Sequence, residues 1–497
     1  MTEKRQFRAI KGTRDILPPD SALWNWFEQT AREVFESYGF RDIRLPIFEE
    51  TSLFARSIGA DTDVVAKEMY TFEDREQFRV AHPLSMVDVI RIDEAVAEAW
   101  QHGRIPRTPA NEAEVLRLHE ASQNIDREGA PALLRFLDGV RNLALGDSLT
   151  LRPEATASVA RAYIEHGMQA LPGNVKLYYA GPMFRRERPQ KGRYRQFYQV
   201  GAEVLGQSDA PAIDAEILEM LLVLFQRVGL ANAKFYVNSI GCKDCRPKYV
   251  ELLREELRKV KDKLGADSQR RIETNPLRVL DSKLPEEQPI IETLPRISDH
   301  LCTDCREHFA KLKDELKLRG IAYEENWRLV RGLDYYTRTT FEVTAAGLGS
   351  QNAVCGGGRY DGLVELLGGP LTKGIGFAIG TDRVILSIQE GGEVPQLPGL
   401  AVYVAWMGAK AYSTAVAIAR KLRECGLAVE LPPEEMKFKK SLGLADKLGA
   451  RYALIIGEDE VASGTYTLKR LADAEQKKLS ENELLECLES ERRGSSA

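Results

Sequence analysis

Apolar positions near the start of the chain recur first with a helical period and then with the alternation of a strand. Residues 21–38 place their large apolar side chains on one helical face, and Gly39 follows as a stop signal. The next segment, FRDIRLPIFE at residues 40–49, has the composition of a strand but contains Pro46, which cannot donate within a central ladder. We therefore predict a helix and then an edge strand, which is either a dimer contact or a plain edge.

A long helical piece separates two segments with the pattern of strands. We expect residues 70–72 to pair with residues 148–151, because both alternate apolar and polar positions. Between them, residues 76–145 carry apolar patterns of helical period around a proline-rich turn, which predicts a small helical insertion. Its role stays open: a spacer, a partner-binding lobe and an RNA-contacting lobe are all compatible with the pattern.

The later part of the chain contains a second insertion and then a separate domain. Residues 242–320 are rich in charged helix formers, which predicts a mostly helical insertion. The glycine- and proline-containing segment 391–398 is typical of a linker. Strands and helices alternate over residues 399–491, which indicates an α/β domain with a mixed sheet, and we expect a disordered tail at residues 492–497.

The most unusual stretch is arginine-rich and reads FRRERPQKGRYRQFYQ at residues 184–199. Its flanks alternate like strands, and Lys191 and Gly192 are typical of a turn, so we predict an antiparallel hairpin with a long loop. Guanidinium groups held on such a ladder can grip phosphate oxygens bidentately, which favours a polyphosphate ligand. The alternative is a solvated basic hairpin on an RNA-binding surface.

Composition narrows the class of protein. A chain of 497 residues is long for one core, so we expect two to four domains. The net charge of −5 means that a nucleic acid would be met by local basic patches. No apolar run approaches the ~18 residues of a membrane span, and the N-terminus lacks the apolar core of a signal peptide. Together with the cysteine usage, this predicts a cytoplasmic protein with no membrane partner.

Four of the seven cysteines form two CxxC pairs within the second insertion. The pairs are Cys242 with Cys245 and Cys302 with Cys305. Four thiolates at this spacing predict a structural Zn²⁺ site that would join two helix ends, with His308 as a possible replacement for one thiolate. The alternative is four reduced cysteines packed as small apolar side chains.

Cations and acids in strand-like segments indicate the kind of reaction. The cations are Arg185, Arg193, Arg331 and Arg383, and the acids are Glu154 and Glu203. Positioning and charge neutralisation by such groups favour phosphoryl or nucleotidyl transfer. No GxxxxGK[ST] sequence occurs, which disfavours a Walker-type NTPase.

These segments resemble those of class II histidyl-tRNA synthetases of the bacterial type. Residues 184–199 resemble motif 2 of class II synthetases, GIGFAIGTDR at 374–383 resembles motif 3, and the helix and strand ending at Pro46 resemble motif 1. Further peptides match the histidyl enzymes, namely KGTRDILP at 11–18, LTLRPEAT at 149–156, RGLDYYTRTTFEV at 331–343 and GGGRYDGL at 356–363. The resemblance covers nearly all of the chain except residues 76–145.

The resemblance implies an α+β fold and a defined activity. An antiparallel-sheet catalytic domain would span residues 1–390, interrupted by the insertions at 76–145 and 242–320. The α/β domain at 399–491 would bind the anticodon. Family members activate L-histidine with ATP and Mg²⁺ to histidyl-adenylate and pyrophosphate, transfer the acyl group to the 3′ end of tRNA(His), and form homodimers.

The resemblance also implies roles for individual residues. Arg331 and Arg185 would be catalytic at the α-phosphate, with Arg331 also contacting the histidine carboxylate. ATP would be bound by Arg185, Arg193, Phe197 and Arg383. The histidine pocket would comprise Glu154, Thr156 and Gln199 at the amino group, Glu203 and Tyr336 at the imidazole, and Tyr335. The motif 2 loop would present Arg188 and Gln190 to the tRNA, and Lys437, Lys439 and Lys440 are either phosphate contacts or a solvated face.

Two points qualify the match. Motif 3 usually ends in Glu-Arg, but Asp382 stands before Arg383 here, which leaves the contact of this shorter acid undefined. A regulatory paralogue that binds histidine without charging tRNA is the main rival, and a prolyl or threonyl synthetase is another. The paralogue typically has a degraded RGLDYY region and no anticodon domain, so an intact peptide at 331–336 favours the ligase.

Overall fold

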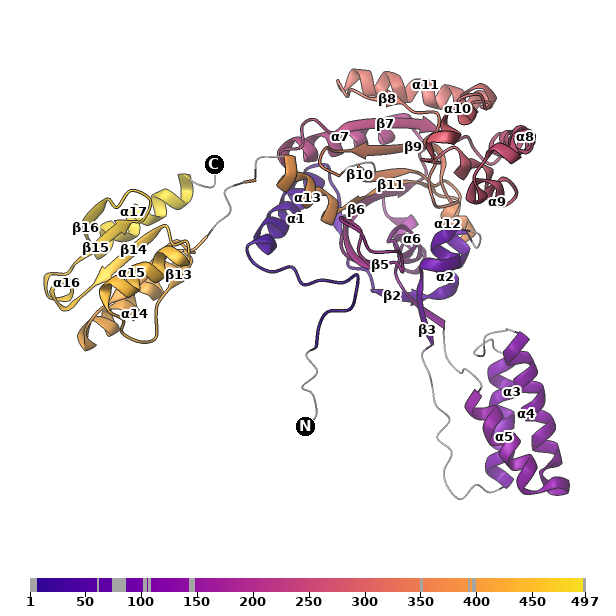
Figure 1. Cartoon of the computed structure of the whole chain (residues 1–497), viewed down its shortest axis with the longest axis horizontal. Coiled ribbons are helices and arrows are strands. Elements are labelled where there is room, and N and C mark those ends of the chain that lie inside the picture. Colours follow the sequence, from indigo (N-terminus) through magenta and orange to yellow (C-terminus); the bar gives the residue numbers. More distant parts are fainter. Residues whose placement is uncertain are drawn as a thin grey trace. The chain divides into compact units, whose positions relative to one another are not determined.

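The computed structural model describes residues 7–59, 62–73, 86–101, 105, 109–142, 148–348, 352–391, 394–395 and 399–494. The chain divides into two compact units, Met1–Val394 and Pro395–Ala497 (Figure 1). Both units combine helices with sheets, which confirms the predicted α+β class.

The first unit is built on an eight-stranded sheet with the order β1-β5-β6-β11-β10-β9-β7-β8. The strands are β1 (Arg41–Asp42), β5 (Val175–Phe184), β6 (Gln196–Gly206), β7 (Lys234–Ser239), β8 (Glu324–Glu325), β9 (Thr337–Thr344), β10 (Ala353–Arg359) and β11 (Lys373–Gly380). All the inner pairings are antiparallel, and the two-residue strands β1 and β8 pair in parallel at the edges. The antiparallel character predicted for this sheet is confirmed.

Helix α1 (Asp20–Ser37) covers one face of this sheet, as its apolar pattern predicts. Its Phe35 ring lies 5.6 Å from the Tyr178 ring of β5 and 5.8 Å from the Phe377 ring of β11. Helices α7 (Pro211–Arg227) and α13 (Thr381–Gly391) pack beside α1. Because side chains alternate along a strand, the residues next to Tyr178 and Phe377 point to the other face.

The predicted single strand at residues 40–49 is wrong, because Pro46 divides it. Residues before Pro46 form β1, whereas those after it form β2 (Phe48–Glu50) in a separate sheet of order β2-β4-β3. Proline has no N–H for a continuous ladder, and its carbonyl oxygen instead accepts from Arg152 Nη1 at 3.1 Å. In this second sheet β3 (Tyr70–Glu73) pairs with β4 (Ser148–Leu151), as predicted.

Both predicted insertions are helical where the structure describes them. The first contains α3 (Met86–Gln101), α4 (Pro109–Glu128) and α5 (Ala130–Asn142), with residues 76–85 and 143–145 outside the described part. Its helices enclose a small core of their own that includes Val96, Leu118 and Phe136. The second contains α8 (Arg246–Lys259), α9 (Ala266–Thr274), α10 (Gln288–Ile291) and α11 (Thr303–Leu318), and its apolar residues join the core of the first unit.

The second unit has a mixed sheet of order β13-β12-β14-β15-β16, as predicted. Its strands are β12 (Val402–Trp406), β13 (Val429–Glu430), β14 (Tyr452–Ile456), β15 (Thr465–Arg470) and β16 (Gln476–Ser480), and its helices are α14 (Ala409–Glu424), α15 (Phe438–Lys447), α16 (Glu458–Ser463) and α17 (Glu481–Gly494). Residues 492–494 belong to α17 rather than to a disordered tail, and residues 495–497 of the predicted tail lie outside the described residues. Among the described helices, none has both the length and the apolar character needed to cross a membrane.

Candidate active site

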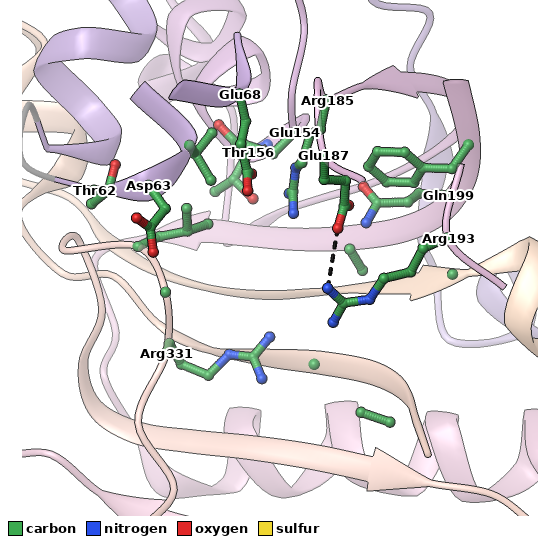
Figure 2. Close-up of a pocket in the computed structure, with 18 of the residues that line it drawn as sticks. Thr62, Asp63, Glu68, Glu154, Thr156, Arg185, Glu187, Arg193, Gln199 and Arg331 are labelled. Atoms are coloured by element: carbon green, nitrogen blue, oxygen red, sulfur yellow. Dashed lines mark hydrogen bonds and ion pairs between the residues drawn. The ribbon is translucent and has the colours of Figure 1, made fainter. Parts of the chain in front are cut away.

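A cavity of about 710 Å³ opens on the sheet face that α1 leaves uncovered. Strands β5, β6, β10 and β11 supply its floor, and the segment at residues 62–68 stands at its rim (Figure 2). Nearly every residue predicted to bind histidine or ATP lines this one cavity, namely Glu154, Thr156, Arg185, Arg193, Phe197, Gln199, Arg331, Tyr335, Tyr336 and Arg383. The fold therefore brings together side chains from distant parts of the sequence.

Part of the floor is bare backbone, across which side chains lie. A Cβ atom at Gly376 would overlap the Glu203 carboxylate, and one at Gly356 would overlap the Arg331 guanidinium. Only glycine lets these charged groups lie against the strands. The glycine runs of β10 and β11 thus determine where two of the predicted substrate groups sit.

The arginine-rich hairpin forms as predicted from β5 and β6. Gln190 and Arg193 bond each other's backbone across the turn, and Gly192 takes a φ of +74°, in the left-handed region. Arg185 Nε donates to the Pro153 carbonyl at 3.0 Å, and its guanidinium points into the cavity (Figure 2). The hairpin therefore presents a fixed cation to the site.

Two acids of the cavity pair with its arginines. Arg193 Nη1 donates to Glu187 Oε2 at 3.1 Å within the same loop (Figure 2). Arg331 Nη1 donates to Glu342 Oε2 at 3.2 Å. These half-exposed pairs hold each guanidinium within the cavity in the structure, and an anionic ligand can compete with the carboxylate for its N–H groups.

Unsatisfied polar atoms mark the interior of the cavity. Arg331 Nε and Gln199 Oε1 are both buried without a hydrogen-bond partner among the described residues. Buried polar groups in folded proteins are paired in the large majority of cases, so two such atoms facing one cavity indicate groups that a bound ligand would satisfy.

Glu154 is held by the helix that follows it. Its Oε2 accepts from the Thr156 backbone N–H at 2.6 Å, and its Oε1 accepts from the Ala157 N–H at 3.0 Å. These are the first amide groups of α6 (Thr156–Glu165), which have no partner inside the helix. Burial raises the pKa of Glu154. The carboxylate is therefore fixed in place at the cavity wall.

Glu203 lies one layer deeper than its predicted neighbours. It is 1% exposed and does not line the cavity. Thr156 Oγ1 donates to one of its oxygens at 2.7 Å, and the Tyr360 hydroxyl donates to the other at 2.7 Å. Burial raises the pKa of Glu203 to about 8. Its predicted direct contact with an imidazole stays a prediction, since Thr156 and Tyr360 stand around it.

Tyr335 and Tyr336 form the aromatic end of the cavity, and a third tyrosine, Tyr360, packs behind them. The rings of Tyr335 and Tyr336 lie 4.7 Å apart, and Tyr335 meets Tyr360 edge-on at 5.9 Å. Tyr360 was missed as a site residue, although it lies within the peptide GGGRYDGL. The sequence feature that could have indicated Tyr360 is its hydroxyl group. It is the one hydroxyl in that peptide, and it can donate to a buried acid.

The structure defines the contact of the unusual motif 3 acid. Asp382 Oδ1 accepts from Arg14 Nη2 at 2.9 Å, and Oδ2 accepts from the Tyr198 N–H of β6 at 2.9 Å. The Arg14 guanidinium also lies 4.3 Å from the Tyr194 ring centre. The shorter acid therefore reaches both partners. Arg14, for which the sequence predicted no role, joins the N-terminal segment to the hairpin.

Comparisons with known proteins agree with this geometry. The histidyl-tRNA synthetase family matches residues 132–384, and the anticodon binding domain family matches residues 401–491. The histidine–tRNA ligase of Koribacter versatilis is 47% identical over 481 residues, which are 96% of this chain and 95% of that protein. This chain belongs to the histidyl-tRNA synthetase family. The ligase of Solibacter usitatus is 46% identical and covers 96% of this chain and 97% of its own.

A solved structure supports the same family. The apo histidyl-tRNA synthetase of S. aureus superposes with a TM-score of 0.69 at 32% identity, covering 97% of this chain and 100% of its own. The resemblance inferred from the motifs is thus confirmed. So are the class II catalytic sheet and the C-terminal anticodon-binding domain of the histidyl-tRNA synthetase family.

The residues predicted to meet tRNA lie outside the cavity. Arg188 and Gln190 are exposed in the loop of the hairpin. In the second unit Lys437, Lys439 and Lys440 are exposed at the start of α15, around the 41% exposed ring of Phe438. Exposed cations next to an aromatic side chain are typical of surfaces that bind single-stranded nucleic acids, and the predicted tRNA contacts stay predictions.

The second insertion also contributes to the cavity, which the sequence did not indicate. Arg270, Arg271 and Arg278 come from α9 and the turn that follows it, and all three line the cavity. Arg271 pairs with Asp63 at 3.5 Å across the opening. No local pattern distinguishes these arginines from other charged helix residues, so only the tertiary arrangement reveals them.

The two CxxC pairs meet in space as predicted. The four sulfur atoms of Cys242, Cys245, Cys302 and Cys305 all lie within 4.8 Å of one another. The suggestion that His308 replaces one thiolate is wrong. Its Nε2 lies 3.0 Å from the Asp209 carbonyl oxygen, because α11 turns this ring away from the cysteines.

Proposed function

We propose that this chain is a histidine–tRNA ligase that forms histidyl-adenylate from L-histidine and ATP and then charges tRNA(His). One observation carries the proposal: residues from four separated stretches of the chain, predicted to bind these two substrates, line a single cavity on an antiparallel sheet. The proposed activity serves translation and would take place in the cytoplasm.

The first step joins two anions, which defines what the protein must supply. The histidine carboxylate would attack the α-phosphorus of ATP, forming a carboxyl–phosphorus bond while the bond to pyrophosphate breaks. We assign Arg331 and Arg185 to the α-phosphate, because both guanidinium groups face the cavity and can offset the charge that builds on its oxygens. The nucleophile is already ionised, so no general base is required.

The rest of ATP would lie along the hairpin. We place the adenine ring between Phe197 and Arg383, and the terminal phosphates at Arg193 after it releases Glu187. Mg²⁺ would neutralise the pyrophosphate leaving group. Glu187 and Glu342 supply the oxygen ligands that this ion prefers, since both carboxylates line the cavity beside arginines.

Histidine would lie at the aromatic end of the cavity. We assign its α-amino group to Glu154, Thr156 and Gln199, and its imidazole to Glu203 and Tyr336, with Tyr335 closing the pocket. All of these residues except Glu203 line the cavity, and Glu203 accepts from Thr156, which does. A neutral imidazole carries one N–H donor and one acceptor nitrogen, so an acid and a phenol are complementary to it. Such a paired polar site rejects apolar amino acids by about 10⁴-fold or more.

In the second step the terminal hydroxyl of tRNA would attack the acyl carbon, and AMP would leave. We propose that Arg188 and Gln190 contact the acceptor end, because they are exposed on the loop next to the cavity. Lys437, Lys439 and Lys440 would contact phosphates near the anticodon.

We further propose a homodimer with its contact at the motif 1 region. Phe48 of β2 and Phe72 of β3 are 47% and 42% exposed, and their rings lie 6.1 Å apart across the central strand β4 of the small sheet. Ile47 beside them is 46% exposed. Adjacent exposed apolar side chains on a short sheet are typical of a surface that a partner covers.

The four cysteines would hold a structural Zn²⁺ ion, which is a proposal separate from catalysis. With a Zn–S bond of about 2.3 Å, the sulfurs of a regular tetrahedron lie about 3.8 Å apart. The sulfur–sulfur distances of 3.7 Å for Cys242 and Cys245, 3.8 Å for Cys242 and Cys302, and 3.8 Å for Cys245 and Cys305 fit this geometry.

The test is ATP–pyrophosphate exchange with each of the twenty amino acids offered singly. We expect exchange with histidine alone. Arg331→Ala should reduce it by about 10²-fold or more, because a cation proposed to contact the reacting phosphate is removed. Arg328→Ala is the matched control, since this nearby arginine bonds the Leu280 carbonyl outside the cavity.

Other outcomes would contradict the proposal in different ways. Exchange with a different amino acid would contradict the assignment of the histidine pocket. It would favour the alternative of a prolyl or threonyl synthetase. Histidine binding without exchange for any amino acid would favour the regulatory paralogue. Charging of a tRNA(His) transcript by the wild type completes the test of the second step.

A further inference from the structure

The cysteine cluster is built into a turn that leads directly to the proposed histidine pocket. Cys245 precedes α8 and Cys302 precedes α11, so each pair sits at a helix start. Backbone N–H groups point at sulfur: the Cys242 N–H donates to Cys245 Sγ at 3.3 Å, and the Asp244 N–H donates to Cys242 Sγ at 3.4 Å. Such bonds favour thiolates, the form that binds metal.

The turn before α8 is bonded to the peptide that carries the pocket tyrosines. The Ile240 N–H donates to the Arg338 carbonyl oxygen at 2.8 Å, and the Arg338 N–H donates to the Gly241 carbonyl oxygen at 2.8 Å. These bonds extend the pairing of β7 with β9 past Ser239. The backbone immediately before Cys242 is thus tied to the backbone just after Tyr336.

Arg246 makes a second connection between the two peptides. It is the first residue of α8, directly after Cys245, and its Nη1 donates to the Tyr336 carbonyl oxygen. Its own N–H donates to the Cys242 carbonyl oxygen at 3.0 Å. One side chain anchored in the cysteine turn therefore fixes the main chain of a residue that lines the cavity.

The connected peptide does not hold its shape by backbone preference alone. Arg338 has a φ of +50°, in the left-handed region that side-chain-bearing residues rarely adopt. Its side chain pairs with Asp209 at 2.7 Å, and its backbone bonds the turn at residues 240–241. The conformation at Arg338 therefore depends on contacts from neighbouring residues, and the turn before the cysteine cluster supplies two of the backbone hydrogen bonds.

We propose that the cysteine cluster, holding Zn²⁺, positions Tyr335 and Tyr336 for histidine, with Arg246 as the positioning residue that transmits the constraint. This rests on the proposed function of the pocket. Zn²⁺ would fix the turn at residues 240–246 against the start of α11, and the bonds to Tyr336 and Arg338 would pass that rigidity to the aromatic end of the cavity. The histidine site, rather than the ATP site, should respond to the metal.

The first experiment leaves the cysteines intact. Arg246→Ala is compared with wild type for zinc content, for histidine affinity by calorimetry without ATP, and for the KM of each substrate in exchange. We expect zinc to stay at one equivalent, the Kd and KM for histidine to rise about tenfold, and the KM for ATP to change less than twofold. Arg254→Ala is the matched control, because this arginine of α8 bonds the Ile272 carbonyl instead.

The second experiment removes the metal from the full chain. Chelation, and separately Cys242→Ser, should release zinc and weaken histidine binding by a similar factor, and added Zn²⁺ should restore binding after chelation. Circular dichroism spectra check that the variants stay folded. Unchanged histidine affinity in Arg246→Ala would contradict the proposal that Arg246 positions the pocket tyrosines. A cysteine cluster that takes up no Zn²⁺ would contradict the proposed metal site. A wild type that fails to bind histidine would instead overturn the proposed function.

Discussion

Glu203, which we propose to bind the imidazole, is also a buried acid that lowers the stability of the fold when it is ionised. Thr156 and Tyr360 donate to its two oxygens, and burial raises its pKa from 4.5 to about 8. An acid whose pKa is higher in the folded than in the unfolded chain binds more protons when folded. The free energy of unfolding therefore falls as pH rises between these two values.

We predict that Glu203→Gln removes this pH dependence. The variant should gain more in Tm over wild type at pH 8 than at pH 5, while exchange with histidine is largely lost because the amide carries no charge for the imidazole N–H. Thermal unfolding at both pH values measures the effect, with Glu286→Gln, an exposed glutamate, as the control. An equal difference in Tm at the two pH values would show that the acid is not titrating between them.

At the scale of elements, the ATP side of the site is held from three directions. The N-terminal segment contributes Arg14, helix α13 contributes Asp382, and strand β6 contributes the Tyr198 N–H. The Gly12 carbonyl oxygen also accepts from the Arg195 N–H at 2.7 Å. Since Tyr198 follows the proposed adenine-stacking Phe197, these bonds determine how the hairpin faces the nucleotide.

Arg14→Ala should therefore act on ATP rather than on histidine. We predict that the KM for ATP in exchange rises about tenfold, as expected when a charge-assisted hydrogen bond is lost, while the Kd for histidine changes little. Asp382→Glu is the companion variant: it restores the acid usual in this family and should stay close to wild type. Equal weakening for both substrates would mean that Arg14 supports the fold in general.

The sequence predicted best where a local pattern is sufficient. The periodic apolar face of α1, the hairpin of β5 and β6, and the mixed sheet of the second unit were all legible from spacing and turn residues. The assignment of strands to sheets could not be predicted at Pro46. A proline indicates where strand pairing stops, but it does not show that the residues before and after it join different sheets. The contribution of Arg270 and Arg271 to the cavity wall could not be predicted from the sequence. It depends on how an insertion packs against residues that are distant in the chain.

At the scale of the whole molecule, the exposed aromatic pair of the small sheet predicts the assembly. If the proposed dimer forms through this pair, Phe48→Glu should convert it to a monomer, because a carboxylate cannot be buried there without a partner. Light scattering after size-exclusion chromatography measures the mass. Leu318→Glu, at an 80% exposed apolar position of α11, is the control and should leave the mass unchanged. A dimeric Phe48→Glu variant would place the interface elsewhere.

The glycine floor of the cavity limits how this enzyme can be redesigned. Because the Glu203 carboxylate and the Arg331 guanidinium rest directly on the backbone at Gly376 and Gly356, even one added methyl group there displaces one of these charged groups. Libraries aimed at an unnatural amino acid should therefore leave these strands untouched. Variation belongs at the rim of the cavity, in the segment at residues 62–68.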